Sequence, residues 1–195
     1  MKHGELTAHL AEILTQELDQ YGIDVLYDHG QQASRPNKVG EIASWFGKDE
    51  DYNFETRLAL LDIAIVDRAT DKAIALIEIE ETTDKPKVLI GDVMAILLGD
   101  GIRFQGKCKL CIGPWTTLIV LGHSSSHEKL VNFLIIQANH LKGCLSTKNA
   151  TIGEVVIGLF SNDIEAKAKL REHVERARLK FLSSNAPLDI APEAK

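Results

Sequence analysis

The sequence predicts one α/β domain in which helices flank a mixed central sheet, made of an antiparallel hairpin and parallel strands. The hairpin is indicated by two aliphatic and β-branched runs, 58–67 and 73–80, with a short polar connection between them. Both runs are apolar on both faces, which favours a position inside a covered sheet over an exposed edge. Two later strand patterns alternate with helical patterns, and crossover connections of that kind make neighbouring strands parallel.

Each element follows from its hydrophobic spacing. Leu6, Leu10, Leu14 and Leu18 form one apolar stripe at helical spacing and predict a helix over 6–20. The other predicted elements are a strand at 23–27, a turn at 28–30, a short helix or loop within 36–51, strands at 58–67 and 73–80, a helix at 86–99, a strand at 117–122, a helix at 126–141, a strand at 155–160 and a helix at 163–182.

The length and composition are those of one globular domain. A chain of 195 residues buries a substantial core but is short for two comparable ones, and 45% hydrophobic with 26% charged residues is typical of soluble proteins. We expect residues 1–182 to form a single domain. The segment 183–195, which contains Pro187 and Pro192, should be a loose tail.

Location is predicted from what the sequence lacks. No apolar run reaches the roughly 20 residues of a membrane span, and the N-terminus has no basic segment followed by a hydrophobic stretch. Cys108, Cys111 and Cys144 are an odd number in a chain large enough to fold without disulfides, so reduced thiols explain them best. We therefore expect a cytoplasmic protein with no membrane partner.

The acidic balance limits how the chain can meet nucleic acid. A net charge of −6 argues against coating DNA through charge alone, because phosphate contacts depend on clustered Lys and Arg. An acidic enzyme can still dock on a duplex when divalent cations bridge its carboxylates to phosphate. DNA therefore stays open as a partner.

Three carboxylates stand where the pattern demands apolar residues. Asp62 interrupts the first run of the hairpin, and Glu78 and Glu80 interrupt the second. Side chains two apart on a strand share a face, so Glu78 and Glu80 project together. Asp62 joins them if the hairpin pairs it with Glu78, which requires an odd-numbered connection or a bulge. A two-residue turn at 70–71 would pair it with Ile79 instead.

A cluster of this kind has to be neutralised. Two carboxylates about 4 Å apart repel by roughly 4 kcal/mol at an effective dielectric near 20, and three such pairs approach the whole stability of a domain. Protons, the nearby Lys85 or Lys87, or divalent cations can provide the compensation. Ligands that are all oxygen favour Mg²⁺ or Mn²⁺ over zinc. We therefore expect Asp62, Glu78 and Glu80 to form a metal site.

An Asp near the start of one strand, a hairpin, a Glu-x-Glu at the end of the next strand and then a helix resemble the PD-(D/E)XK nuclease motif. The resemblance covers the order of elements from Leu6 to about Phe160, although three motif residues carry it. It implies a restriction-endonuclease-like fold in which Asp62 is the family's Asp and Glu78 its first strand carboxylate. In that family the two acidic residues hold the catalytic metal ion, and a Lys positions or activates the attacking water.

The chain departs from this motif at two positions. Leu61 stands where the motif has Pro, which is often absent, and Glu80 stands where it has Lys. Some restriction endonucleases of the family have Glu at this place, which leaves Glu80 as a metal ligand or general base. Lys85 or Lys87 is the alternative, as a lysine moved to the entrance of the next helix, although both also fit solvated surface charges.

Other interpretations stay open for these and other residues. Glu78, Glu80 and Glu81 can instead end a strand and begin a solvated loop, with Asp62 as a local cap. The spacing of Cys108 and Cys111 matches half a zinc site, but no second pair follows at ligand spacing, and small buried thiols are favoured. The remaining available zinc ligands are Cys144, His123, His127 and His140.

Further motifs give weaker signals. His123 and His127 flank three serines without a glycine-flanked nucleophile elbow, so a loop with Ser126 as helix N-cap is favoured. Gly-rich phosphate loops are absent. The last helix has an excess of positive charge, which we interpret as a solvated face, with DNA phosphate contact the alternative. Its basic residues are Lys167, Lys169, Arg171, Arg176, Arg178 and Lys180, and the candidates for an additional upstream acid are Glu12, Glu41 and Glu55.

These features predict a Mg²⁺- or Mn²⁺-dependent nuclease that hydrolyses DNA phosphodiester bonds, with Asp62, Glu78, Glu80, Lys85 and Lys87 as candidate catalytic residues. One alternative is an inactive member of the same fold that binds nucleic acid or protein, because Glu80 replaces Lys. Another is an oligomeric regulatory protein whose acids are only solvated. A homodimer fits all three, since duplex cleavage often uses two-fold symmetry.

Overall fold

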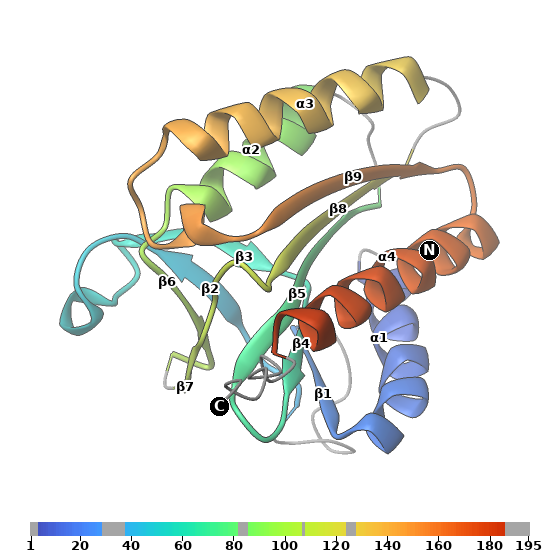
Figure 1. The fold of residues 1–195 in the computed structure, drawn as a ribbon, viewed down its shortest axis with the longest axis horizontal. Coiled ribbons are helices and arrows are strands. Elements are labelled where there is room, and N and C mark those ends of the chain that lie inside the picture. Colours follow the sequence, from blue (N-terminus) through green and yellow to red (C-terminus); the bar gives the residue numbers. More distant parts are fainter. Residues whose placement is uncertain (1–3, 29–37, 82–85, 107, 124–127, 186–195) are drawn as a thin grey trace, which may run out of the picture.

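The computed structural model describes residues 4–28, 38–81, 86–106, 108–123 and 128–185. It has a mixed sheet with helices on both faces, as the sequence predicts (Figure 1). The main sheet has the strand order β1-β4-β5-β8-β9. Its strands are β1 (Ile23–Tyr27), β4 (Ile63–Asp67), β5 (Lys72–Glu80), β8 (Thr117–His123) and β9 (Glu154–Phe160).

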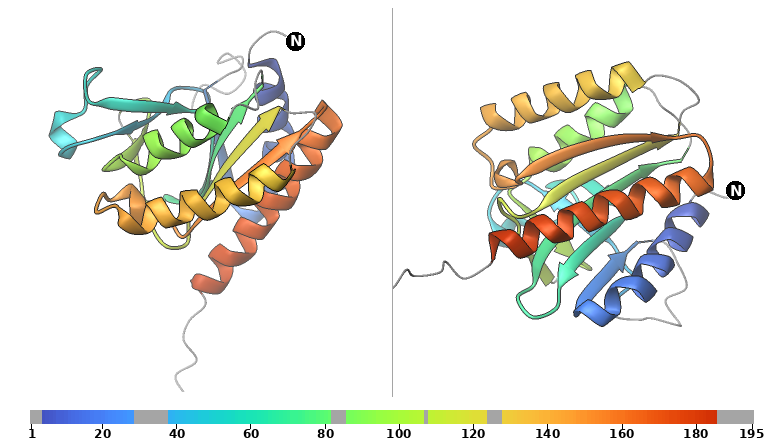
Figure 2. Two further views of the ribbon diagram at one scale, coloured as in Figure 1. Left: turned by 90° about the horizontal axis from the view of Figure 1, so that it is seen from above. Right: turned by 45° about the vertical axis from the view of Figure 1, so that its right-hand side comes forward.

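Two pairs of helices cover the main sheet. The helices α1 (Glu5–Leu18) and α4 (Asp163–Ser184) lie on one face, and α2 (Pro86–Leu97) and α3 (Glu128–Cys144) lie on the other (Figures 1 and 2). Three short 3₁₀ turns are η1 (Asp19–Tyr21), η2 (Asp49–Asp51) and η3 (Asn149–Thr151). All four helices were predicted from their apolar stripes. Among the described residues, none of the helices combines the length and the hydrophobicity of a membrane span.

The ends of the last helix differ slightly from the prediction. Its N-cap is Asn162, whose side chain accepts a hydrogen bond from the Glu165 N–H at 3.0 Å. It runs to Ser184, two residues beyond the predicted end at 182. The predicted tail beyond Asn185, the serine loop at 124–127 and most of the predicted turn at 28–30 lie outside the described residues.

The prediction of a covered central hairpin is confirmed. The strands β4 and β5 pair antiparallel and lie between β1 and β8, and Ala73 to Ile77 of β5 are fully buried. The strands β8 and β9 continue the sheet parallel to β5, as their crossover connections predict. Because β1 pairs antiparallel with β4, it also runs parallel to β5. The ends of β1, β5, β8 and β9 therefore meet along one edge of the sheet, which we call the carboxyl edge.

A second antiparallel sheet, which we call the wing, has the strand order β3-β2-β6-β7. Its strands are β2 (Ile42–Trp45), β3 (Arg57–Leu61), β6 (Gly101–Phe104) and β7 (Cys108–Leu110). Two predictions are wrong here. The stretch 36–51, expected as a short helix or loop, contributes the strand β2. The run 58–67, expected as one strand, forms two strands in different sheets. The strands β6 and β7 were not predicted.

The chain leaves the wing and enters the main sheet at Asp62, the one residue between β3 and β4. Its backbone carbonyl accepts a hydrogen bond from the Asp28 N–H at 3.1 Å, and its carboxylate accepts one from the Ile79 N–H at 2.7 Å. These contacts join residues far apart in the chain, so no local pattern reveals the break. Strands as short as β7 also carry too few alternations for periodicity to detect.

The pleat of β5 separates two apolar cores. Ile77 and Ile79 face the core beneath α1 and α4, whereas Leu76 belongs to the core beneath α2 and the wing. A fully buried aliphatic side chain contributes about 1.5–3 kcal/mol relative to exposure. This alternation also assigns Glu78 and Glu80 to the α2 side, because side chains two apart share a face.

Candidate functional site

Carboxylates gather on the α2 side of the carboxyl edge. Glu78 and Glu80 end β5, Asp62 precedes β4, and Asp28 follows β1. Asp92 joins them from α2, whose apolar side packs on the same core. In open α/β sheets, ligands bind outside the carboxyl ends of the strands, so the acids lie where this architecture places binding sites.

A β-bulge sets the register that brings Asp62 to Glu78. Four residues, 68–71, connect β4 and β5, and the first pairs are Asp67 with Lys72 and Val66 with Ala73. The register then shifts between Val66 and Ile65, so that Ile63 pairs with Ile77. The next facing positions along the hairpin are Asp62 and Glu78. This is the pairing for which the sequence required an odd-numbered connection or a bulge.

Hydrogen bonds from backbone N–H groups hold the two acids beside each other. The Asp62 carboxylate accepts from the Ile79 N–H at 2.7 Å, and the Glu78 carboxylate accepts from the Asp62 N–H. The second carboxylate oxygen of Glu78, Oε2, is buried and has no hydrogen-bond partner among the described groups. The Oδ2 atom of Asp92 is likewise buried without a hydrogen-bond partner among the described groups. Buried polar atoms are normally hydrogen-bonded, so these two oxygens call for a proton or a cation.

The electrostatics of the cluster support this interpretation. Burial, followed by the charges of Asp62, Asp92 and Asp28, raises the pKa of Glu78 to about 10. Burial, followed by the charge of Glu80, raises the pKa of Asp92 to about 6. Without a cation, Glu78 therefore holds a proton at neutral pH. Perturbed carboxyl groups of this kind concentrate at functional sites.

The donor atoms of the cluster suit a divalent cation, but few of its side chains lie close enough together to bind one ion. All of its donor atoms are oxygens, which suits Mg²⁺ or Mn²⁺. Among the described residues, no three His, Cys, Asp or Glu side chains are grouped closely enough to hold one ion. Mg²⁺ usually keeps several waters and binds through one or two carboxylates plus substrate phosphate. The facing pair of Asp62 and Glu78 provides that number of carboxylates.

The lysines proposed from the sequence have different outcomes. Lys87 is exposed on α2, and within the described part of the chain no contact joins it to the acids. Lys85 lies outside the described residues. Glu80 is half-buried at the end of β5 and acts on Asp92 through its charge.

Glu81 belongs to a different environment from its neighbours on β5. Its Oε1 atom accepts hydrogen bonds from the Thr7 N–H and the Thr7 Oγ1, each at 3.1 Å, and its Oε2 accepts from the Gly4 N–H at 3.2 Å. These donors belong to the N-terminus of α1, where a negative charge is favourable. Glu81 is therefore a structural tie between β5 and α1, not the solvated loop residue of the alternative interpretation.

The candidate upstream acids have surface or structural roles in the described residues. Glu41 accepts hydrogen bonds from Arg57 Nη1 at 2.6 Å and from the Tyr52 hydroxyl at 2.9 Å, within the wing. Glu12 on α1 and Glu55 beside the wing are exposed. Two acids of the cluster were missed. Asp92 interrupts the apolar pattern of α2 and was detectable by the logic applied to Asp62, whereas Asp28 was read only as a turn residue.

The cysteines and histidines do not assemble a zinc site in the described chain. Cys108, Cys111 and Cys144 are all free and exposed, so the expectation that they are buried is wrong. Cys108 and Cys111 lie on either side of the buried Leu110 at the surface of the wing, and Cys144 lies at the exposed end of α3. His123 and His140 are exposed, and His127 lies outside the described residues.

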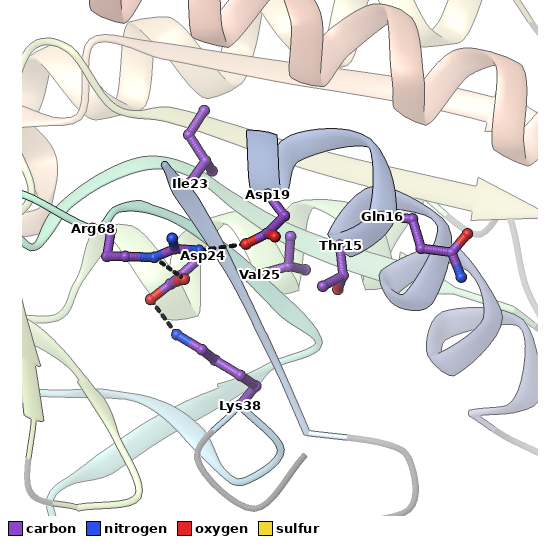
Figure 3. A pocket seen from close by; sticks show the side chains of 8 residues that line it. All are labelled: Thr15, Gln16, Asp19, Ile23, Asp24, Val25, Lys38 and Arg68. Carbon is purple, nitrogen blue, oxygen red and sulfur yellow. Dashed lines mark hydrogen bonds and ion pairs between the residues drawn. The ribbon is translucent and has the colours of Figure 1, made fainter. Parts of the chain in front are cut away.

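A separate hollow of about 430 Å³ lies between α1 and β1 (Figure 3). Asp24 at its centre pairs with Lys38 and with Arg68 Nε at 2.8 Å, and Arg68 Nη2 reaches Asp19 at 2.6 Å. Burial alone would raise the pKa of Asp24, but the hydrogen bonds from Lys38 and Arg68 outweigh burial and hold it below its ordinary value. The charged groups of this hollow satisfy one another, which distinguishes it from the acid cluster.

The basic side chains of α4 are also largely paired with acids. Arg171 pairs with Glu17 of α1, and Arg176 pairs with Glu154 of β9. Within α4, Arg178 pairs with Glu175 at 2.8 Å, and Lys169 with Glu165 at 3.0 Å. This agrees with a solvated, ion-paired helical face.

Comparison with models of known protein families, with curated proteins and with solved structures finds no match to this chain.

Proposed function

We propose that this chain is a divalent-cation-dependent nuclease of the PD-(D/E)XK type, with a restriction-endonuclease-like fold, that hydrolyses phosphodiester bonds in DNA. The observation that carries the proposal is the facing pair of Asp62 and Glu78, in which a buried carboxylate oxygen has no described partner. The element order around this pair is the one on which the resemblance to that family rests.

The position of the pair supports the proposal. Both acids lie at the carboxyl edge, Glu78 on β5 and Asp62 directly before β4, so the pairing of these two strands sets their separation. A carboxyl that is protonated when no cation is present can exchange its proton for a metal ion, which removes the repulsion described above.

The residues have distinct roles in the proposed mechanism. Asp62 and Glu78 would hold the cation, and the hydrogen bond from the Ile79 N–H keeps the Asp62 carboxylate in place. Glu80, at the position of the family's Lys, would accept a hydrogen bond from the attacking water or hold a second ion. A bound Mg²⁺ or Mn²⁺ supplies the positive charge that lowers the pKa of water and stabilises the leaving oxygen. No covalent intermediate is required.

A cleavage assay tests the proposal. Plasmid, linear and branched DNA would be incubated with the protein and Mg²⁺ or Mn²⁺, comparing wild type with Asp62→Ala and Glu78→Ala. Glu55→Ala is the matched control, because it removes an exposed acid beside the wing. We expect cleavage by wild type and by the control, and loss in both site variants. Wild-type inactivity on every substrate would contradict the proposal.

A second candidate is an inactive protein of the same fold that binds nucleic acid or another protein. It is favoured by Glu80 at the position of the family's Lys, together with the exposed position of Lys87. Thermal unfolding separates the two candidates. A working cation site stabilises the folded protein by an amount that grows with the logarithm of the metal concentration above the dissociation constant, whereas a degraded site gains little from Mg²⁺ or Mn²⁺.

A further inference from the structure

The strand β9 pairs with β8 and ends the strand order of the main sheet. Its sequence has one charged residue, Glu154 at its start, and no proline. The helices α3 and α4 lie on either side of it (Figures 1 and 2). Between these helices a hollow of about 440 Å³ follows the strand, and we call it the edge hollow. An uncharged edge strand is open to pairing with another chain, and a hollow of this volume holds a small ligand.

Side chains close the two ends of this edge. Asn139 of α3 donates from Nδ2 to the Val155 carbonyl at 3.2 Å, and its Oδ1 accepts from the Val155 N–H at 3.4 Å. Lys169 of α4 donates to the Leu159 carbonyl. The side-chain amide of Asn139 therefore makes the pair of hydrogen bonds that a residue of a neighbouring strand would make.

The middle of the edge, at Ile157, is left open. Alternate residues of a strand direct their backbone N–H and C=O groups to the same side, so those of Ile157 face the hollow, as those of Val155 and Leu159 do. Within the described part of the chain, no side chain hydrogen-bonds to the backbone of Ile157. Buried backbone groups are normally paired, so the edge hollow suits a ligand that offers a donor and an acceptor side by side, as a peptide backbone does.

The two walls of the edge hollow differ in chemistry. Val131 and Ile135 of α3 are apolar and pack against the core beneath α2. The α4 wall is polar and includes Nδ1 of His173, which is buried without a hydrogen-bond partner among the described groups. The charged side chains of this wall are Lys169, Arg176 and Glu172. Because positive charges outnumber the negative one, the α4 wall favours acidic groups and the α3 wall favours apolar ones.

We infer that the edge hollow binds a short extended peptide segment of another protein, which pairs with β9 at Ile157. Residues directly opposite each other on paired strands share a face of the sheet, and Ile157 faces the core on the α3 side. The peptide residue opposite Ile157 therefore packs on the α3 wall, and its two neighbours turn towards α4. An apolar residue between two acidic residues matches both walls. Because Asn139 and Lys169 close the ends, the open length is about three residues, or roughly 10 Å.

A second copy of β9 does not fit this edge. Side chains from α3 and α4 reach the outward-facing backbone groups at its two ends, so the edge lies in a recess between the helices. Paired strands lie about 4.8 Å apart. In a dimer through β9, the helices beside one edge would meet those beside the other before the strands came this close. A peptide without flanking helices meets no such obstacle.

Nuclear magnetic resonance of isotope-labelled protein tests the inference, with acetyl-Glu-Ile-Glu-amide as the probe. We expect saturable shifts of the amide signals of residues 156–159, with a dissociation constant of about 1 mM or below. Two control peptides each change one feature. N-methylation of the central Ile removes the donor to the Ile157 carbonyl, and acetyl-Lys-Ile-Lys-amide reverses the charge. Both should bind at least about fivefold more weakly.

A charge reversal in the α4 wall should strengthen binding. Glu172→Lys replaces an exposed acid of that wall, so the acidic peptide should bind at least about threefold more tightly at low salt. Glu12→Lys makes the same change at an exposed position on α1, and it should leave the affinity within about twofold of wild type. Damage to the fold weakens binding, so a gain in Glu172→Lys alone reports the charge of the hollow.

Three outcomes would overturn the inference. One is the absence of saturable shifts at residues 156–159, and another is equal binding of the acidic peptide and its N-methyl or basic form. The third is a shift of the same signals that grows with protein concentration when no peptide is present, because it would assign the edge to a second copy. The measurements require neither metal nor DNA, so their outcome is independent of the proposed nuclease activity.

Discussion

Glu78 and Glu81 are three residues apart at the end of one strand, yet their surroundings are opposite. Glu81 accepts three hydrogen bonds from the N-terminus of α1, where the helix dipole favours its charge. Glu78 faces α2, beside Asp62, and burial raises its pKa to about 10. The pleat sends the two side chains to opposite faces of the sheet. The same side chain therefore forms a structural tie on one face and part of a buried acid cluster, with an unpaired carboxylate oxygen, on the other.

Within a run of like charges, the hydrogen-bond partners of each carboxylate distinguish a structural residue from a candidate ligand-binding residue. A carboxylate whose oxygens are matched by backbone donors contributes to stability and has little left to offer a ligand. A carboxylate buried among other acids costs stability, and it persists only where a proton or cation compensates. Changing each glutamate by the smallest step, to Gln, tests this distinction.

The largest effect is expected on catalysis. Glu78→Gln keeps the shape of the side chain but removes the charge that would hold the cation, so DNA cleavage should fall by at least about a thousandfold. Glu81→Gln should keep cleavage within about tenfold of wild type. The measurement is the rate of plasmid nicking in Mg²⁺ and in Mn²⁺. Equal losses in the two variants would mean that the two faces of β5 do not differ in function.

The next largest effect is expected on the stability of the metal-free protein, which should depend on pH. The folded pKa of Glu78 is raised from an ordinary 4.5 to about 10, so between these values the folded state holds a proton that the unfolded state releases. Stability is therefore highest near the lower value and falls as pH rises, by at most about 1.4 kcal/mol per pH unit. Asp92 adds the same sign from 3.8 to about 6.

Chemical denaturation in the presence of a chelator, at several values from about pH 5 to pH 8, measures this slope. Other groups contribute too: burial lowers the pKa of His173, which gives stability the opposite trend near its titration. The difference between wild type and Glu78→Gln isolates the glutamate. Wild type should lose stability relative to the variant as pH rises, and a difference that is flat across this range would contradict the prediction.

Metal binding should reverse the cost of the acid cluster. At a concentration a hundredfold above its dissociation constant, Mg²⁺ or Mn²⁺ should raise the free energy of unfolding by about 2.7 kcal/mol. Thermal unfolding with increasing metal measures this in wild type, Glu78→Gln and Glu81→Gln. We expect the stabilisation to disappear in Glu78→Gln alone. Its presence in all three proteins would point to a cation bound elsewhere.

The smallest effect is expected at the structural tie. Glu81→Ala removes the acceptor for the Gly4 and Thr7 N–H groups, and the loss of a helix cap costs about 1–2 kcal/mol. Urea denaturation of wild type and Glu81→Ala measures the difference. Glu12→Ala on the same helix is the control, because its side chain is exposed, and it should change stability by less than about 0.5 kcal/mol.

Much of the fold was predictable because its long elements repeat a pattern. The stripe of Leu6, Leu10 and Leu14 gave α1, and two-sided apolar runs gave the buried hairpin β4–β5. The wing was not predictable in the same way. Its strands are three to five residues long, and β2 is recognisable as a strand only through its pairing with β3 and β6.

The candidate site was predictable in part for the same reason. Asp62, Glu78 and Glu80 stand out in the sequence as acids in apolar runs, and Asp92 interrupts the apolar pattern of α2 in the same way. The facing of Asp62 and Glu78 depended on a bulge at the far end of the hairpin, between Ile65 and Val66. No property of the acids themselves indicates that bulge.

The sequence by itself determined the order of the four helices and of the main-sheet strands, the burial of the central hairpin and the shared face of Glu78 and Glu80. These features depend on hydrophobic periodicities of two residues in strands and 3.6 residues in helices, which can be recognised within a single segment of the chain. Only the tertiary structure decided that Asp62 meets Glu78, that Asp92 joins them and that Glu81 ties β5 to α1. The last of these contacts spans more than seventy residues of chain, and its partners are selected by the packing of whole elements.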